Sequence, residues 1–147
     1  MSRTSVLAVS LFAVFAVPAS GSDPVVYFSG EQTRAAFAVG KPLTENASYK
    51  VHASRRERPG QAEVHELDTD IIYVLDGTAT IVTGGTSTDA ATTAPHERRG
   101  ASITGGTTKR LAKGDVIVVP HGTAHQFTEV QGLFLYYVVK VTTGAPR

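Results

Sequence analysis

Short segments rich in apolar and β-branched residues recur along the chain after residue 49, with Gly or Pro between them. This pattern is typical of the strands of a sandwich or barrel. Upstream, Ser29 and Gln32 have the spacing of a helix capping box, and Gly40-Lys41-Pro42 would end the helix. The pattern predicts an all-β domain with one short N-terminal helix. The predicted strands cover residues 50–56, 61–66, 70–75, 78–83, 101–104, 109–111, 115–119, 124–130 and 133–141.

Two connections between the strands follow from residue type. Asp76-Gly77 predicts a two-residue hairpin turn, because Gly accepts a positive φ at no steric cost. Residues 84–100 are rich in Thr, Ala, Ser and Gly, and this composition predicts a long mobile loop.

Two predicted strands, residues 71–75 and 134–139, are apolar on both faces. A strand that is covered on one side only should alternate between apolar and polar residues. We therefore expect the helix or a second copy of the chain to cover the outer face, and we predict a homodimer packed sheet to sheet.

The first residues have the layout of a secretory signal peptide. Arg3 precedes an apolar run over residues 6–17, and Pro18-Ala19-Ser20-Gly21 follows it. The run is shorter than the about 20 apolar residues of a spanning helix. We expect a signal peptide over residues 1–21, one domain over residues 22–147, a secreted or periplasmic location, and no membrane partner after cleavage. The alternative is a retained membrane anchor.

Composition excludes several kinds of chemistry. The chain has no cysteine, so disulfides, thiolate zinc sites and a thiol nucleophile are ruled out. Its 147 residues suit a single domain. The formal net charge of +1 gives no reason to expect nucleic acid as a partner.

Four residues predict a metal site. Glu63 and His65 are two apart on one predicted strand, so both side chains point to the same face. Asp70 begins the next strand and can share that face, and His125 projects inward from a later strand. Two imidazoles and one or two carboxylates inside a barrel favour a bound cation, since burying them without one costs several kcal/mol. The alternative is a hydrogen-bonded polar cluster without metal.

The role of Glu63 has two interpretations. It is either a fourth ligand beside His65, Asp70 and His125, or a catalytic proton donor or acceptor next to the metal. Three further residues are expected to contact the ligands and hold them in place. His52 lies on the predicted strand before Glu63, and Phe127 and Glu129 point inward with His125 because alternate residues of a strand share a face.

These residues lie in two motifs that resemble those of the cupin superfamily. The first reads Gly60, then Glu63-x-His65-x4-Asp70-x6-Gly77, and the second reads Gly114-x5-Pro120-x-Gly122-x2-His125-x3-Glu129. Glu63 stands where the family usually has His, Asp70 where it has Glu, and Glu129 where it often has Asn. The resemblance covers nearly all of the domain and implies a single-domain jelly-roll β-barrel with a divalent metal.

The expected metal is copper, because an exported protein meets ions outside the cytoplasm, where affinity favours Cu(II). Iron, manganese and zinc remain open. The chain is also similar to small secreted bacterial cupins that include copper enzymes cleaving cellulose oxidatively. That resemblance implies a carbohydrate polymer as substrate, aldonic acid products, and sugar contacts by Tyr73, Tyr136 or Tyr137; the alternative places these tyrosines in the core or a dimer contact.

Two other function classes stay open at this point. One is a different metal-dependent cupin enzyme on a small molecule, either a sugar isomerase or a dioxygenase. The other is a non-catalytic module that binds a metal or a small ligand inside the barrel. A small, dry cavity would favour a small substrate, and a metal near a flat rim would favour a polymer.

Overall fold

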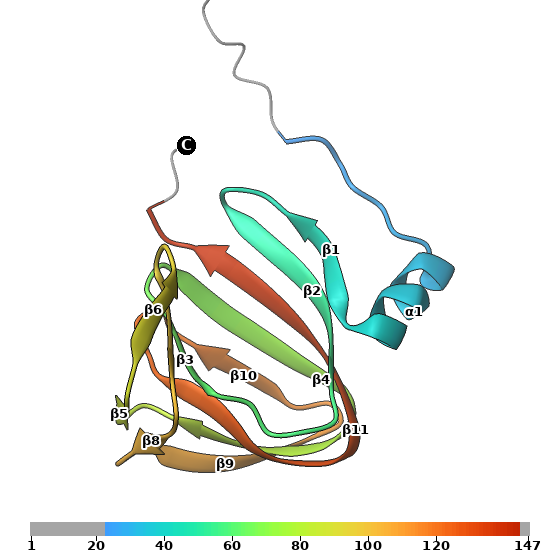
Figure 1. The fold of residues 1–147 in the computed structure, drawn as a ribbon. Coiled ribbons are helices and arrows are strands. Elements are labelled where there is room, and N and C mark those ends of the chain that lie inside the picture. The colour runs from blue at the N-terminus through green and yellow to red at the C-terminus, as the bar shows by residue number, and fades with distance from the viewer. Residues whose placement is uncertain (1–22, 145–147) are drawn as a thin grey trace, which may run out of the picture.

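The computed structural model describes residues 23–144, and the predicted signal peptide lies outside this range. The described part contains one helix and eleven strands, so the predicted all-β class with one short N-terminal helix is confirmed (Figure 1). The elements are α1 (Gly30–Val39), β1 (Lys41–Glu45), β2 (Tyr49–Arg56), β3 (Ala62–His65), β4 (Asp68–Thr83), β5 (Thr86–Ser87), β6 (Ala91–Ala94), β7 (Glu97–Gly100), β8 (Ile103–Thr104), β9 (Thr107–Ala112), β10 (Val116–Val119) and β11 (His125–Thr142).

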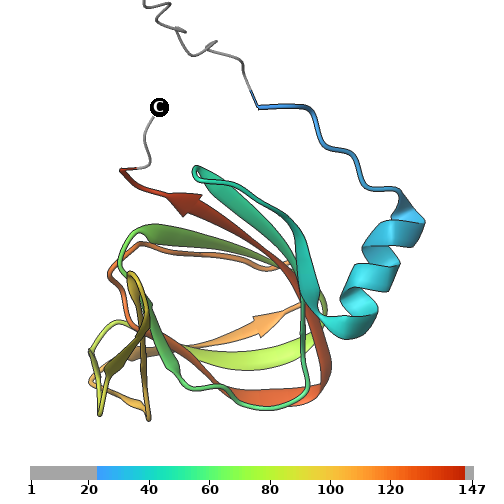
Figure 2. The same cartoon turned by 45° about the horizontal axis from the view of Figure 1, so that its top comes forward.

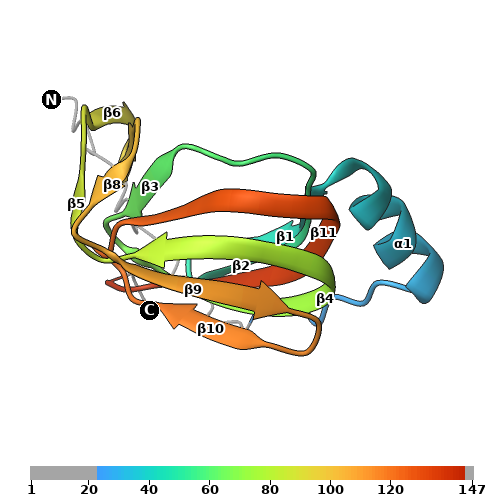
Figure 3. The ribbon, with the colours of Figure 1, turned by 90° about the horizontal axis from the view of Figure 1, so that it is seen from below.

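Two long antiparallel strands, β4 and β11, form the frame of the barrel. They pair along almost their whole length, with Val74 opposite Tyr136. β11 also pairs with β2 and β3, whereas β4 pairs with β9 and β10. The sheet therefore curls into a barrel whose interior is visible in Figure 2. The short strands β5, β6 and β8 gather at the end of the barrel opposite α1 (Figure 3).

The hairpin predicted at Asp76-Gly77 is wrong. Strand β4 runs without interruption through both residues, and Gly77 has a φ of 78°. The register of β11 shifts opposite this point, where Gly132 has a φ of 66°. A Cβ on Gly77 would overlap the carbonyl oxygen of Leu133. The glycine thus allows a bend within a long strand pair, which is a β-bulge rather than a turn.

The mobile loop predicted for residues 84–100 is also wrong. This segment contains β5, β6 and β7, and β7 pairs with β3 along its whole length. All four residues of β6 are exposed, so its sequence, Ala91-Thr-Thr-Ala, carries no apolar alternation that would mark a strand. The pairing matters for the site because it places Glu97 opposite His65 and Arg99 opposite Glu63.

The predicted helix begins and ends where the sequence indicated. The Ser29 side chain accepts from the backbone N–H of Gln32, the Gln32 side chain accepts from the N–H of Ser29, and Gly40 ends the helix in the left-handed conformation. Phe37 packs edge-on against Tyr137, with 5.0 Å between ring centroids. The helix therefore covers part of the outer face of β2 and β11.

The remaining outer face is open. The largest fully buried side chains are Phe134, Ile72, Ile81 and Val74, which pack together inside the barrel. On the opposite side of the sheet, several apolar residues of β4 and β10 are exposed: Ile71, Tyr73, Val116 and Val118. Nothing among residues 23–144 covers them. Within the same range, no helix has the length and apolar character needed to cross a membrane.

Candidate metal site

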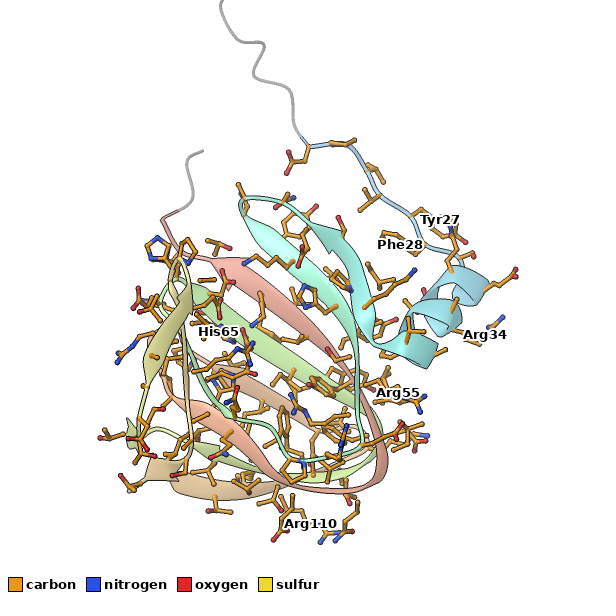
Figure 4. All side chains as sticks on the ribbon, viewed as in Figure 1. Tyr27, Phe28, Arg34, Arg55, His65 and Arg110 are labelled. Atoms are coloured by element: carbon orange, nitrogen blue, oxygen red, sulfur yellow. The ribbon has the colours of Figure 1, made fainter. Side chains whose placement is uncertain are left out.

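Glu63, His65 and His125 come together at one end of the barrel interior. Glu63 and His65 lie on β3, and His125 begins β11 directly opposite Glu63. One potential ligand atom from each of the three side chains lies within 4.8 Å of the other two. Figure 4 labels His65 on the side of the barrel where β6 lies. The structure thus brings together three of the four residues predicted as ligands.

Asp70, the fourth, lies between the two imidazoles. Its Oδ2 is 3.6 Å from Nε2 of His65 and 3.7 Å from Nε2 of His125. Lys140 Nζ, however, donates to both oxygens of Asp70, at 2.7 and 2.9 Å. Asp70 therefore faces the cluster while its charge is neutralised by an ammonium, and a cation at the cluster would compete with Lys140 for this carboxylate.

The orientation of His65 is fixed by Glu97. Nδ1 of His65 lies 2.5 Å from Oε2 of Glu97. A carboxylate can only accept, so Nδ1 is the donor in this contact. The other ring nitrogen, Nε2, is buried and has no hydrogen-bond partner among residues 23–144. It faces the oxygens of Glu63 and Asp70, each at 3.6 Å, so a cation placed between them would contact this nitrogen and both oxygens.

His125 is oriented in a similar way, with Nδ1 in a hydrogen bond and Nε2 toward the cluster. Its Nδ1 donates to the carbonyl oxygen of Thr123 at 3.3 Å, which leaves Nε2 facing Asp70. Burial lowers the pKa of His125 below its usual 6.5, although Asp70 opposes part of this effect. The ring is therefore neutral at pH 7 and available as a nitrogen ligand.

Glu63 has two differently engaged oxygens. Oε1 accepts from the Arg99 guanidinium, whereas Oε2 lies 3.6 Å from Nε2 of His65. Burial raises the pKa of this carboxyl, but Arg99, His125 and His65 together lower it by more, so the net pKa lies below 4.5. Glu63 is therefore an ionised carboxylate with one oxygen directed at the cluster.

Of the three residues expected to support the ligands, two line the barrel interior and one does not. Phe127 is buried and lines the interior. His52 also lines it, but its Nε2 is 2.6 Å from Oε1 of Glu45. Glu129 does not point inward: a register shift between Phe127 and Glu129 reverses the alternation, and Glu129 is exposed and accepts from Thr80. The expectation of an inward Glu129 is wrong because a bulge interrupts period two.

Solved structures identify the type of barrel. BH2720 from Bacillus halodurans matches with a TM-score of 0.58 at 14% identity, covering 87% of this chain and 88% of that one. A cupin with a double-stranded β-helix fold from Methanocaldococcus jannaschii matches with a TM-score of 0.50 at 11% identity, covering 71% and 79%. A candidate mannose-6-phosphate isomerase from Ralstonia eutropha matches with 0.51 at 14%, covering 71% and 84%.

The chain has a cupin-type fold. No protein-family model matches the sequence, and no curated protein sequence matches it. At these identities the likeness concerns the fold, so the chemistry of this cupin barrel has to be argued from its own side chains.

A cavity of about 700 Å³ lies inside the barrel, and Glu63, His65 and His125 are among the residues that line it. Every second residue of β2 lines it: Lys50, His52, Ser54 and Arg56. Phe127 and Tyr136 form an apolar wall, with ring centroids 5.4 Å apart. Of the tyrosines, Tyr136 is thus in the interior, Tyr137 packs under the helix, and Tyr73 lies on the outer face.

Four functional residues were absent from the predicted site: Glu97, Arg99, Lys140 and Arg56. The first two lie in the segment predicted as a loop, which shows no alternation. The other two could have been found, because Arg56 is in phase with His52 on one strand, and Lys140 is in phase with Tyr136 on another. The nitrogen and oxygen donors of this site are those that first-row divalent metals bind.

Proposed function

We propose that this cupin is a metal-dependent enzyme that acts on a small polar molecule inside the barrel by proton transfer, in the manner of a sugar isomerase. The observation that carries the proposal is the buried Nε2 of His65. It has no hydrogen-bond partner among residues 23–144, and the oxygens of Glu63 and Asp70 face it, each at 3.6 Å. A bound cation would satisfy all of these groups at once.

His65 and His125 would hold the metal, and Asp70 would join them if Lys140 gave it up, so that Glu63 stays beside the metal as the proton acceptor. A divalent metal in such a site supplies Lewis acidity, which polarises a carbonyl or hydroxyl oxygen. The proposal leaves the identity of the metal open, because the nitrogen and oxygen donors suit copper and equally zinc, iron or manganese.

Glu63 supports the assignment to proton transfer. Arg99 neutralises Oε1 and keeps the carboxyl ionised at pH 7, so Oε2 can accept a proton from a substrate carbon or hydroxyl. Lys140 stands beside Asp70 within the same cavity, as an ammonium donor for a substrate oxygen. These roles need a substrate within hydrogen-bond reach, and the cavity provides the space for one.

The position of the cluster favours a small substrate over a polymer. His65 and His125 are each 5% exposed and Asp70 is 4% exposed, so the donors lie within the barrel and not on a flat rim. Oxidative cleavage of cellulose by copper has less support for this reason. A non-catalytic binding module is the remaining alternative, and product analysis separates it from an enzyme.

Metal binding is tested first, by calorimetric titration of the metal-free mature protein with Zn²⁺, Cu²⁺ and Mn²⁺. One tightly bound ion per chain is expected, with a loss on the order of 100-fold in affinity for His65→Ala and His125→Ala. His96→Ala is the matched control, because His96 is exposed and lies outside the cavity. Equal affinities in all three variants would contradict the site.

The reaction is tested next with the metal-loaded protein. It is incubated in D₂O with a panel of aldoses, ketoses and sugar acids, and NMR follows deuterium incorporation next to the carbonyl. Incorporation that Glu63→Gln abolishes would support proton transfer. Metal binding without incorporation would leave the binding module, and oxidised products would indicate redox chemistry instead.

A further inference from the structure

Arg56 is a cavity-lining cation at the end of β2. Its Cζ lies 4.9 Å from the centre of the Phe127 ring, and its guanidinium packs against Gly60 so closely that a Cβ there would overlap Nη1. Nε of Arg56 is buried and has no hydrogen-bond partner among residues 23–144. Gly60 thus provides the room that holds the guanidinium plane over the aromatic wall of the cavity.

Arg56 differs from the other cations that line this cavity. Lys50 lies 2.5 Å from Asp68, Lys140 is bound to Asp70, and Arg99 is bound to Glu63. Within the described part of the chain, Arg56 has neither an ion pair nor a side-chain hydrogen bond. A half-buried cation without a partner is unfavourable unless an anion reaches it, because it has lost part of its hydration.

We propose that Arg56 binds the carboxylate of the substrate, so that the cavity takes small hydroxy or keto acids, including sugar acids. This inference rests on the proposed function in one respect, namely that the same substrate would also contact the metal. A guanidinium presents two parallel N–H groups in the geometry of a carboxylate, and such a pair is stronger than a neutral hydrogen bond. Phe127 and Tyr136 would pack against the carbon skeleton.

The lining charges favour a carboxylate over a phosphate at Arg56. Each of the other lining Lys and Arg residues already has a carboxylate partner, so Arg56 is the one left for an anion among the described residues. The lining carboxylates Glu45 and Glu97 contact His52 and His65, and they add negative charge that opposes a dianion. One guanidinium matches a monoanion, whereas a phosphate monoester carries close to two negative charges at pH 7. At Arg56 itself, a dianion would leave about one of its charges without a partner, because the neighbouring lining cations are already paired.

The test compares three probes that share a sugar ring: D-glucuronate, D-glucose and D-glucose 6-phosphate. Binding to the mature protein is measured by calorimetry, both metal-free and loaded with Zn²⁺. Wild-type protein should bind glucuronate about tenfold or more tightly than glucose, as expected for a charge-assisted hydrogen bond. Arg56→Gln should remove this preference while leaving Zn²⁺ affinity within about twofold, and Arg56→Lys should keep part of it.

Arg55→Gln is the matched control. Arg55 is the neighbouring residue on β2, points to the outer side of the sheet near α1 and pairs with Glu57 (Figure 4). Its loss should leave glucuronate binding unchanged. Equal binding of glucuronate and glucose by the wild type would overturn the proposal, and so would an unchanged preference in Arg56→Gln. Tighter binding of glucose 6-phosphate than of glucuronate would overturn the carboxylate assignment.

The two hypotheses can fail separately. If the wild type binds no metal, the proposed function fails, but the dependence of glucuronate binding on Arg56 is still measured on the metal-free protein. If Zn²⁺ binds and Arg56 has no effect on glucuronate, only the substrate class is wrong. Thermal unfolding of each variant shows whether loss of the contact between Arg56 and Phe127 has changed the fold.

Discussion

Glu97 and His65 are cross-strand partners on β7 and β3, and Oε2 of Glu97 lies 2.5 Å from Nδ1 of His65. The pairing defines which nitrogen of His65 carries a proton and which one faces the cluster. It also connects the candidate metal site to residues 84–100, a segment whose composition gives no sign of a functional site. The consequence is that mutations on β7 should affect metal binding without touching a ligand.

Glu97→Gln should weaken Zn²⁺ binding by about 10–100-fold, the usual cost of losing the partner behind a ligating histidine. The amide can still accept from Nδ1, but it supplies no negative charge to raise the basicity of Nε2. Calorimetric titration of the metal-free protein measures the change. Glu66→Gln is the control, since Glu66 pairs with the exposed His96 in a similar contact outside the cavity. A variant of Glu97 with wild-type affinity would show that His65 is oriented by other means.

Lys140→Met should destabilise the metal-free protein by about 3 kcal/mol, because it leaves the buried Asp70 carboxylate without its counter-ion. Saturating Zn²⁺ should recover most of this loss, since the metal then neutralises Asp70. Urea unfolding with and without Zn²⁺ measures both quantities. Lys50→Met breaks the pair with Asp68, which does not face the imidazoles, so Zn²⁺ should not rescue it. Equal Zn²⁺ stabilisation of both variants would remove Asp70 from the ligand set.

His125 should make the metal-free protein less stable in mild acid. Its pKa in the folded state lies below 6.5, mainly because the ring is buried. The unfolded chain therefore takes up a proton at this residue as the pH falls through about 6.5, and the folded chain does so only at lower pH. The difference favours unfolding over that range.

The measurement is the free energy of unfolding in urea for the wild type and His125→Gln, once near neutral pH and once in mild acid. The wild type should lose more stability on acidification than the variant does. Because a single proton is involved, the extra loss stays below about 1.4 kcal/mol for each step of one in pH. An equal loss in both proteins would mean that His125 is not the group responsible.

The sequence predicts residues of this site correctly where side chains alternate regularly between the two faces of a strand. His65 and His125 could be found because their spacing on strands sets the face to which they point. The prediction for Glu129 was wrong because a bulge follows Phe127, and no residue type nearby indicates that bulge. Glu97 and Arg99 could not be assigned, since their partners on β3 are distant in the sequence and only the pairing of β3 with β7 brings them together.

The fold was predictable at the level of class and less so at the level of connections. The helix was found from its capping box, which is a local signal. The bend at Gly77 resembles a hairpin in the sequence because a positive φ at glycine serves both a turn and a bulge equally well. What distinguishes them is the 18-residue partner strand β11, a non-local feature.

The exposed side of β4 and β10 is the surface on which the predicted homodimer would pack. Val116 lies opposite Tyr73 and Val118 opposite Ile71, so four apolar side chains, exposed by 36% to 60%, form one patch on the outer face. Contiguous apolar patches of this kind usually mark an interface. A second copy can present the same patch about a two-fold axis, which satisfies both faces at once.

The double variant Val116→Lys, Val118→Lys should convert a dimer into a monomer, because four ammonium groups would then meet across the two-fold axis. Sedimentation of a protein comprising residues 22–147 measures the mass before and after the change. Val39→Lys is the control, since Val39 is 70% exposed at the end of α1, outside the patch. Both variants should keep Zn²⁺ binding, as none of the substituted residues lines the cavity. A wild type that sediments as a monomer at every concentration would contradict the dimer, and the patch would then need a different occupant.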